Sequence, residues 1–285
     1  MKQLTVLASG LLTTVQDLGR PGHAALGIGR SGACDRQAAA LANRLVGNLA
    51  TAAVLEVTFG GLTVRAEHDL LVVTTGARCP GSPAHCAPTR LRAGDLLALA
   101  VPAAGLRTVL AVRGGIAVPP VLGSRSTDVL AGIGPPVVRA GDVLPVGNAT
   151  GSLPGVDLAP IADPPSGLVT VQVSSGPRRH WFDDEAWHLL TGQMWTVGGD
   201  SNRVGLRLDG RALTRSRSGE LPSEGLVRGA LQVPPSGLPV LLLADHPVTG
   251  GYPVIAYVHD GDVDACAQLR PGQPLRLSSA GRSVG

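Results

Sequence analysis

Short apolar runs alternate with glycine- and proline-rich turns along almost the whole chain. Runs of this length that are rich in Val, Leu and Thr are typical of β-strands. The pattern therefore predicts a mainly-β fold with a few short helices. The expected strands are 4–7, 13–16, 54–59, 62–66, 70–75, 96–101, 108–113, 115–118, 168–173, 194–197, 239–244 and 254–258.

Two segments have helical patterns instead. In 35–48, Asp35 can cap the first turn, small and apolar residues form one stripe at helical spacing, and Gly47 can end the helix. We expect this helix to plug or cover one end of a barrel. A shorter helix is expected at 183–190, where the acidic start suits a helix N-terminus.

A very polar loop lies between the apolar runs 239–244 and 254–258. Its two adjacent glycines permit positive φ or a close approach of a ligand to the backbone. An ordinary tight turn uses the same residue types, but so many functional groups beside a buried strand favour a binding site. The residues of this loop are Asp245, His246, Thr249, Gly250, Gly251 and Tyr252.

Two polar turns farther upstream resemble each other in composition. The first contains Gln16, Asp17 and Arg20, and the second contains Asn202 and Arg203. Each turn can bind a polar ligand, or it can satisfy its own groups through an Asp–Arg pair. If the two halves of the chain are related, the two turns occupy equivalent places.

The segment 148–166 is rich in Gly, Pro, Ser and Asp and has no periodicity, which is typical of a domain boundary. We expect two domains, 1–155 and 156–285. A short pattern, Arg-Ala-Gly-Asp followed by a strand, occurs at 92–99 and at 139–146, and in a looser form at 270–277. Each copy predicts a glycine turn that leads into a strand, as related β units would have.

Composition and charge exclude several classes of function. The net charge is +3, but the arginines are scattered and aromatic residues make up only 2%, so nucleic-acid binding is not favoured. Lys2 is the only lysine, which leaves no Walker lysine, no Schiff-base lysine and no internal lysine for attaching biotin. No apolar run approaches the roughly 18 residues of a membrane span.

The four cysteines lack the paired spacing of a zinc site. Cys79, His85 and Cys86 are the nearest approach to a metal-ligand set, but no second pair accompanies them. We therefore expect no metal, and reduced thiols in a cytoplasmic protein.

Seven motifs occur in the order TTVQDLGRPG (13–22), SGACDRQAAALANRLVGN (31–48), LEVTFGG (55–61), VRGGIAVPPVLGSRSTD (112–128), SNRVGLRLDG (201–210), SEGLVRGALQVPPSGLPVLLLAD (223–245) and TGGYPVIA (249–256). In combination they resemble the family of the C subunit of 5-oxoprolinase, also labelled allophanate hydrolase subunit 2. That family is similar to the carboxyltransferase domain of biotin-dependent urea carboxylase. The resemblance covers nearly the whole chain and implies two cyclophilin-like β-barrel domains.

The resemblance implies a component of a complex that opens pyroglutamate to glutamate with ATP. Its partners would be a homologue of the B subunit and a third, lactamase-like A subunit, with the ATP bound on a partner and no covalently bound cofactor in this chain. Two alternatives stay open. One is a carboxyltransferase component that uses biotin carried on another chain, and the other is a regulatory protein that binds a homologue of a kinase inhibitor.

Allophanate hydrolysis itself is not favoured. In the amidase-signature fold its triad includes a lysine and its nucleophile lies in a Ser/Gly-rich motif, whereas the nearest stretch here, GSRSTD at 123–128, lacks the repeated glycines. The loop before TGGYP reads DHPV where relatives are closer to DGQT, so the resemblance assigns no role to His246.

A lactam such as pyroglutamate presents a carboxylate, a carbonyl oxygen and an N–H, so its pocket needs a cation, donors near the carbonyl, and an acceptor. We predict Glu224, as acceptor or base, and Tyr252 as catalytic residues. The structural alternative is an ion pair between Glu224 and Arg203 that lines a barrel end. The predicted substrate-binding residues are Gln16, Asp17, Arg20, Asn202, Arg203, Ser223, Gln232, Asp245, Thr249, Gly250 and Gly251.

Overall fold

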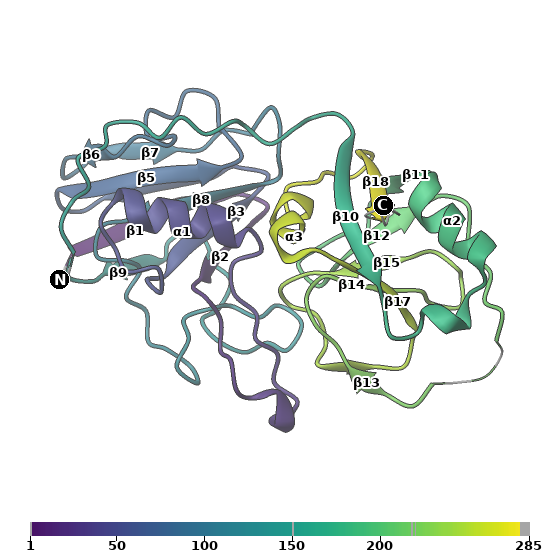
Figure 1. Ribbon diagram of the computed structural model, residues 1–285. Helices are drawn as coiled ribbons and strands as arrows, with labels where there is room; N and C mark the ends of the chain where they lie inside the picture. The colour runs from purple at the N-terminus through teal and green to yellow at the C-terminus, as the bar shows by residue number, and fades with distance from the viewer. Residues whose placement is uncertain (1, 150, 218, 220, 280–285) are drawn as a thin grey trace. The chain divides into compact units, whose positions relative to one another are not determined.

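The computed structural model describes residues 2–149, 151–217, 219 and 221–279. The chain divides into two compact units, one made of 1–21 with 30–164 and the other of 22–29 with 165–285 (Figure 1). The division after Pro164 lies inside the predicted linker 148–166, beyond the expected boundary at 155. The segment 22–29, which includes the 3₁₀ turn η1 (Ala24–Leu26), is grouped with the second unit.

The first unit contains two antiparallel sheets. The strand order is β7-β4-β1-β9 in one and β2-β3-β8-β5-β6 in the other. One apolar cluster, which includes Leu4 and Val64 of the first sheet and Leu55 and Leu110 of the second, forms the core between them. The strands are β1 (Lys2–Ser9), β2 (Leu12–Gln16), β3 (Val54–Thr58), β4 (Leu62–Ala66), β5 (Leu70–Gly76), β6 (Thr89–Leu91), β7 (Leu96–Ala98), β8 (Arg107–Val112) and β9 (Val143–Val146).

Helix α1 (Arg36–Leu45) begins where the sequence predicts. The Asp35 side chain caps it by accepting a hydrogen bond from the Ala38 N–H at 2.8 Å. The expectation that this helix covers a barrel end is wrong: its apolar stripe packs on β5 and β8, against Val73, Val109 and Ala111 (Figure 1). The small side chains of the stripe let the helix lie close to the sheet face.

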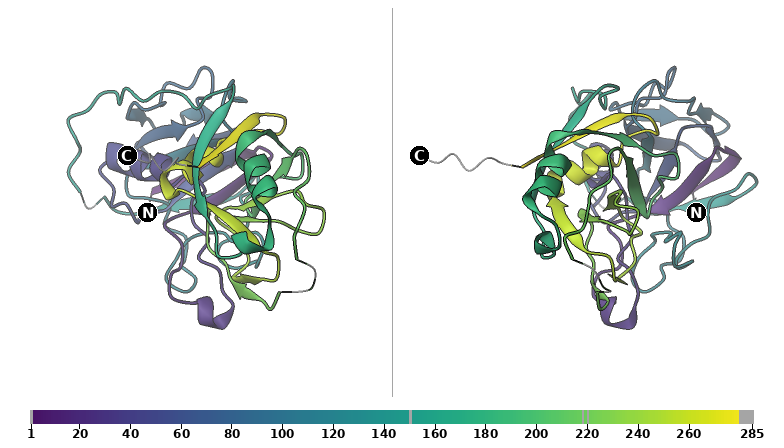
Figure 2. Two further views of the ribbon diagram at one scale, coloured as in Figure 1. Left: turned by 45° about the vertical axis from the view of Figure 1, so that its right-hand side comes forward. Right: turned by 90° about the vertical axis from the view of Figure 1, so that its right-hand side faces the viewer.

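The second unit is a closed seven-stranded barrel in the order β10-β17-β14-β15-β12-β11-β18. Figure 2 shows these strands curving around one another. The strands are β10 (Val169–Ser175), β11 (Met194–Val197), β12 (Gly205–Asp209), β14 (Ala230–Gln232), β15 (Val240–Leu242), β17 (Val254–Val258) and β18 (Pro274–Ser279). A two-stranded ladder of β13 (Glu224–Gly225) and β16 (Thr249–Gly250) is separate from the barrel.

The mainly-β class is confirmed, and the barrel prediction holds for the second unit. In the first unit the strands pair as two separate sheets, because among the described residues no backbone ladder joins β6 or β2 to the four-stranded sheet. Helix α2 (Asp184–Gly192) is capped by Asp183, as predicted. Helix α3 (Asp260–Cys266), the turn η2 (Arg179–Trp181) and strand β14 lie outside the predicted elements.

The three copies of the repeated pattern form the same turn. In each, the side chain of the fourth residue accepts a hydrogen bond from the backbone N–H of the first: Asp95 from Arg92 at 2.7 Å, Asp142 from Arg139 at 2.8 Å and Gln273 from Arg270 at 3.2 Å. The third residue is a glycine with φ of +93°, +93° and +83°, respectively, which other residues rarely adopt. The turns lead into β7, β9 and β18, as the repeat predicts.

Candidate functional site

The first polar turn follows β2 directly and is buried. Gln16 is fully buried, and its Nε2 donates to Thr14 Oγ1 at 3.0 Å and to the Thr127 carbonyl at 2.9 Å. Its Oε1 has no hydrogen-bond partner among the described residues. Since a buried carbonyl oxygen without a donor is costly, this atom is available to a ligand or an ordered water.

Asp17 holds the turn against the segment 124–126. Its Oδ1 accepts from the hydroxyls of Ser124 and Ser126, both at 2.6 Å, and from the Gly19 N–H at 2.8 Å. Its Oδ2 accepts from the Arg125 N–H at 2.6 Å. Four donors leave this carboxylate little capacity for a substrate, so its role is to position the turn.

Arg20 lies in the same turn and is 1% exposed. Its Nη2 donates to the Ser126 carbonyl, whereas Nε and Nη1 have no acceptor within the part of the chain that the structure describes. A Cβ at Gly134 would lie 2.8 Å from this Nη2 and 2.0 Å from the Ser126 oxygen, so only glycine fits there. Burying a guanidinium whose N–H groups lack acceptors costs folding free energy, unless an anion or a water molecule accepts hydrogen bonds from them.

Ser124, Ser126 and Thr127, which surround this turn, are not among the site residues predicted from the sequence. Their stretch, GSRSTD, ends the family motif at 112–128 and was compared with an amidase motif, but no binding role was predicted for it. Its three closely spaced hydroxyl residues after a glycine were the signal, but their partner lies more than 100 residues away in the sequence: the separation from Asp17 to Ser126 is 109.

In the second polar turn, the buried arginine is paired with a carboxylate. Arg203 and Asp245, each 1% exposed, form a two-point ion pair with Nε–Oδ2 at 2.9 Å and Nη2–Oδ1 at 3.0 Å. Their backbones are also joined, because the Asp245 N–H donates to the Arg203 carbonyl at 3.0 Å. The structure thus pairs these two predicted substrate-binding residues with each other.

Asn202 is exposed and stabilises the same turn. Its Oδ1 accepts from the Val204 N–H at 2.8 Å and from the Gly205 N–H at 3.4 Å. This is the local side-chain-to-backbone bonding that Asn favours in turns. His246, in the loop after Asp245, contacts its neighbour's carbonyl through Nδ1, 2.8 Å from the Pro247 oxygen.

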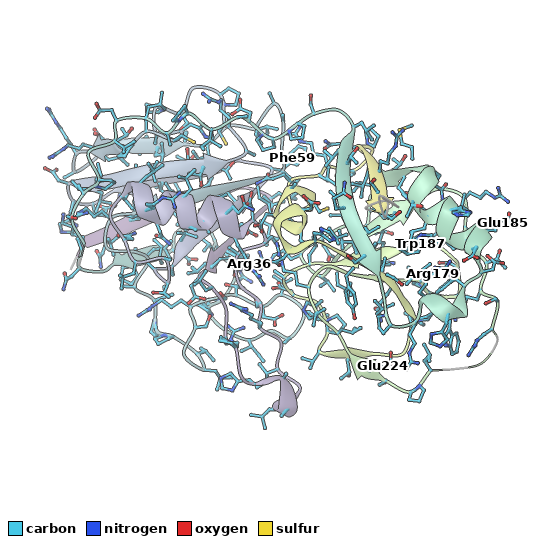
Figure 3. All side chains as sticks on the ribbon, viewed as in Figure 1. Arg36, Phe59, Arg179, Glu185, Trp187 and Glu224 are labelled. Atoms are coloured by element: carbon cyan, nitrogen blue, oxygen red, sulfur yellow. The ribbon has the colours of Figure 1, made fainter. Side chains whose placement is uncertain are left out.

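Glu224 lies on the β13–β16 ladder, where it is paired with Gly250. Its carboxylate binds Arg178, with Nε–Oε2 at 3.1 Å and a second contact from Nη2 to Oε1. The alternative pair between Glu224 and Arg203 is therefore wrong. Both side chains of the real pair are partly exposed, Glu224 at 28% and Arg178 at 30%, so this carboxylate remains accessible. Figure 3 shows the place of Glu224 at β13.

The ladder also brings together the predicted residues of 249–252 and Gln232. Gln232 is 6% exposed and its Nε2 donates to the Tyr252 carbonyl at 3.1 Å. Neither Gly250 nor Gly251 has positive φ. Gly250 is closely packed instead, since an added Cβ would lie 2.9 Å from Leu226 Cδ1 and 3.0 Å from Gln232 Nε2, and these side chains would have to move.

Three predicted residues of this ladder region are open to solvent. Ser223 and Thr249 are exposed, and Tyr252 is 48% exposed. A large aromatic side chain that is half in solvent is available for a ligand or a partner chain. The structure thus assembles Glu224, Arg178, Gln232 and 249–252 in the second unit, and Gln16, Asp17 and Arg20 in the first.

The thiols and His85 have no arrangement for nucleophilic or metal chemistry. Burial raises the pKa of Cys79, Cys86 and Cys266, the last to about 12, so these thiols stay protonated. Burial, and next the charge of Arg78, lower the pKa of His85. Within the described residues no three His, Cys, Asp or Glu side chains are grouped to hold a metal ion.

The chain and its fold belong to a known class of β protein. Residues 26–279 match the family model described as carboxyltransferase domain, subdomain A and B, so the chain belongs to that family. Among curated relatives, the C subunit of 5-oxoprolinase from Escherichia coli is 40% identical over 96% of this chain and 90% of its own length. The resemblance seen in the sequence motifs is thereby confirmed.

Solved structures support the same assignment. The structure of TTHA0988 superimposes with a TM-score of 0.88 and 35% identity, over 98% of this chain and 56% of that chain. This chain therefore spans little more than half of that protein. The urea carboxylase of Kluyveromyces lactis superimposes with a TM-score of 0.88 and 28% identity, over 98% of this chain and 27% of that chain. Among helices of described residues, none is long and apolar enough to cross a bilayer.

Proposed function

We propose that this chain is a component of an ATP-dependent 5-oxoprolinase complex that opens pyroglutamate to glutamate. The observation that carries the proposal is its 40% identity to the C subunit of Escherichia coli 5-oxoprolinase over nearly the full length of both proteins. The partners are a homologue of the B subunit and a lactamase-like A subunit. ATP binds on a partner, because the only lysine here is Lys2 and no phosphate loop accompanies it.

The free atoms of the first polar turn match the substrate. Arg20 offers free donors on two nitrogens, Nε and Nη1, either of which can donate to a carboxylate oxygen, and Gln16 offers Oε1, which can accept from a lactam N–H. The two side chains already contact consecutive carbonyls, Ser126 and Thr127, so their free atoms lie in one neighbourhood. Since both side chains are buried, substrate contact requires this turn to open locally.

Glu224 is the proposed acceptor or base, and Tyr252 the proposed hydroxyl donor. The two-point contact with Arg178 fixes the orientation of the Glu224 carboxylate and leaves it partly exposed. Gln232 holds the Tyr252 backbone through its carbonyl. Arg203 and Asp245, by contrast, support the loop that leads to these residues.

A second candidate is a carboxyltransferase component. The specific observation in its favour is the structural match to Kluyveromyces lactis urea carboxylase. Because Lys2 is the only lysine, any biotin must be carried on another chain. The partly exposed backbone of 249–251 can then supply donors for a transferred carboxyl group.

The test is reconstitution with purified homologues of the 5-oxoprolinase A and B subunits from the same source. We expect pyroglutamate-dependent release of glutamate and ADP only when all three proteins are present. A parallel reaction contains urea, bicarbonate, ATP, biotin carboxylase and a biotinylated carrier. Carboxylation of urea in that reaction, with no opening of pyroglutamate in the first, would replace the proposal by the second candidate.

A further inference from the structure

A separate cavity of about 750 Å³ lies wholly within the first unit. It is formed where β1, β5 and β6 begin or end and where the chain leaves β9, and Figure 1 shows the N-terminus and the start of β5 at the same end of this unit. None of the predicted catalytic or substrate-binding residues lines it. The lining residues are Lys2, Asp69, Leu70, Leu71, Arg90, Leu91, Arg92, Asp95, Arg113, Gly147, Asn148, Ala149 and Leu153.

Four cationic residues, Lys2, Arg90, Arg92 and Arg113, line this cavity. Lys2 Nζ donates to the Asp69 carbonyl at 2.8 Å, and Arg113 donates to the carbonyls of Val46 and Gly151 at 2.8 and 2.6 Å. Arg90 and Arg92 are exposed. Neutral carbonyls orient these groups without cancelling their charge, so the positive potential in the cavity persists.

The two carboxylates in the lining are engaged with backbone amides. Asp69 Oδ1 accepts from the Ala93 N–H at 3.0 Å, and Asp95 Oδ2 accepts from the Arg92 N–H at 2.7 Å. Within the part of the chain that the structure describes, no ion pair joins either carboxylate to Lys2, Arg90, Arg92 or Arg113. The lining thus has four cations and two carboxylates, a formal excess of two positive charges.

Much of the remaining wall is apolar, although Asn148 also lines it. Leu70, Leu71, Leu91 and Leu153 line the cavity beside the cations. Its volume falls in the range of about 300–1,000 Å³ that is typical of small-molecule sites. A site with both apolar walls and excess positive charge suits an organic anion better than a bare inorganic ion.

We propose that this cavity binds a small organic polyanion, whose phosphate or carboxylate groups contact Arg90 and Arg92. Guanidinium groups bind both kinds of oxyanion in the same two-point geometry. The site is independent of the proposed lactam chemistry, because it shares no residue with the first polar turn or with the β13–β16 ladder. A bound polyanion would contact both the β5–β6 hairpin and the turn at 92–95.

The test is calorimetric titration of the full chain at low ionic strength with ATP, pyrophosphate, citrate and neutral adenosine. We expect saturable binding of at least one polyanion and much weaker binding of adenosine. Binding of ATP and pyrophosphate alone identifies a phosphate ligand, and binding of citrate alone identifies a polycarboxylate. No saturable polyanion binding, or adenosine binding as tight as ATP binding, would refute the site.

The repeated turn supplies a matched control. The double variant Arg90→Gln and Arg92→Gln should weaken polyanion binding by about tenfold or more, since it removes two charge-assisted contacts. Arg139→Gln, at the equivalent exposed position of the second turn, should leave the affinity within about twofold. Equal losses in both proteins would indicate non-specific charge attraction and would overturn the proposal.

A second measurement does not depend on the variants. Hydrogen exchange of the wild-type chain with and without the bound polyanion should show new protection at 89–95 and none at 139–142. Protection elsewhere, with 89–95 unchanged, would place the ligand outside this cavity and refute the assignment.

Discussion

Two buried arginines, Arg20 and Arg203, show how residues of one type in similar turns acquire different roles. Each is 1% exposed. Arg203 has its charge matched by Asp245 in a two-point pair, whereas two nitrogens of Arg20 have no acceptor in the described structure. The first arrangement is expected to stabilise the fold, and the second leaves donors for a ligand.

This difference predicts unequal effects on stability. Arg203→Met leaves Asp245 buried without its partner and should lower the free energy of unfolding by about 3–5 kcal/mol. Arg20→Met loses one hydrogen bond but also removes a poorly paired buried charge, so its stability should stay within about 1 kcal/mol of wild type. Urea unfolding at neutral pH measures both. A large loss for Arg20→Met would show that Arg20 is structural.

At the scale of elements, the loop that follows β16 packs closely against the segment that precedes β13. An added Cβ at Gly251 would lie 3.1 Å from the Leu221 carbonyl oxygen, whereas one at Gly199 meets nothing within 4 Å. Gly251→Val should therefore displace the loop 249–252 and abolish turnover of the reconstituted complex, while Gly199→Val should not. Glu224→Ala should abolish turnover as well. Near-normal turnover by Gly251→Val and Glu224→Ala, both folded and assembled, would remove this ladder from the site.

The repeated turns give a second prediction at this scale. In the described structure the Asp142 side chain bonds only within its turn, but that of Gln273 also donates from Nε2 to the carbonyls of Pro165 and Gly167, at 2.8 and 2.9 Å. Gln273→Ala should therefore cost more stability than Asp142→Ala, by about 1–2 kcal/mol. Equal losses in urea unfolding would show that the two extra bonds contribute nothing measurable.

Local signals in the sequence were sufficient to predict some helices and turns but not others. The caps Asp35 and Asp183 and the glycine turns of the repeat act over three or four residues, so the sequence predicts them correctly. Helix α3 was missed because its acidic, glycine-containing sequence has no clear apolar stripe. In the site, Arg178 was missed because its bond to Glu224 spans 46 residues and depends on the barrel.

At the scale of the whole molecule, the chain is expected to act only within a complex. With one lysine and no phosphate loop, it lacks the Walker-type site that usually positions ATP for hydrolysis. The purified chain alone should neither hydrolyse ATP nor consume pyroglutamate, as measured by release of phosphate and glutamate. Sustained turnover without partners would contradict its assignment as one component of a larger enzyme.

The most direct test is the activity of Arg20→Met in the complete three-protein complex. Because truncating a buried charge contact costs about 2–5 kcal/mol, kcat/KM for pyroglutamate should fall by about 30-fold or more, with assembly unchanged. Arg30→Met is the matched control, since Arg30 is exposed and donates from Nε to the Leu18 carbonyl of the same turn. It should retain near-normal kcat/KM. Wild-type kcat/KM in assembled Arg20→Met would show that this arginine does not bind the substrate and would contradict the account.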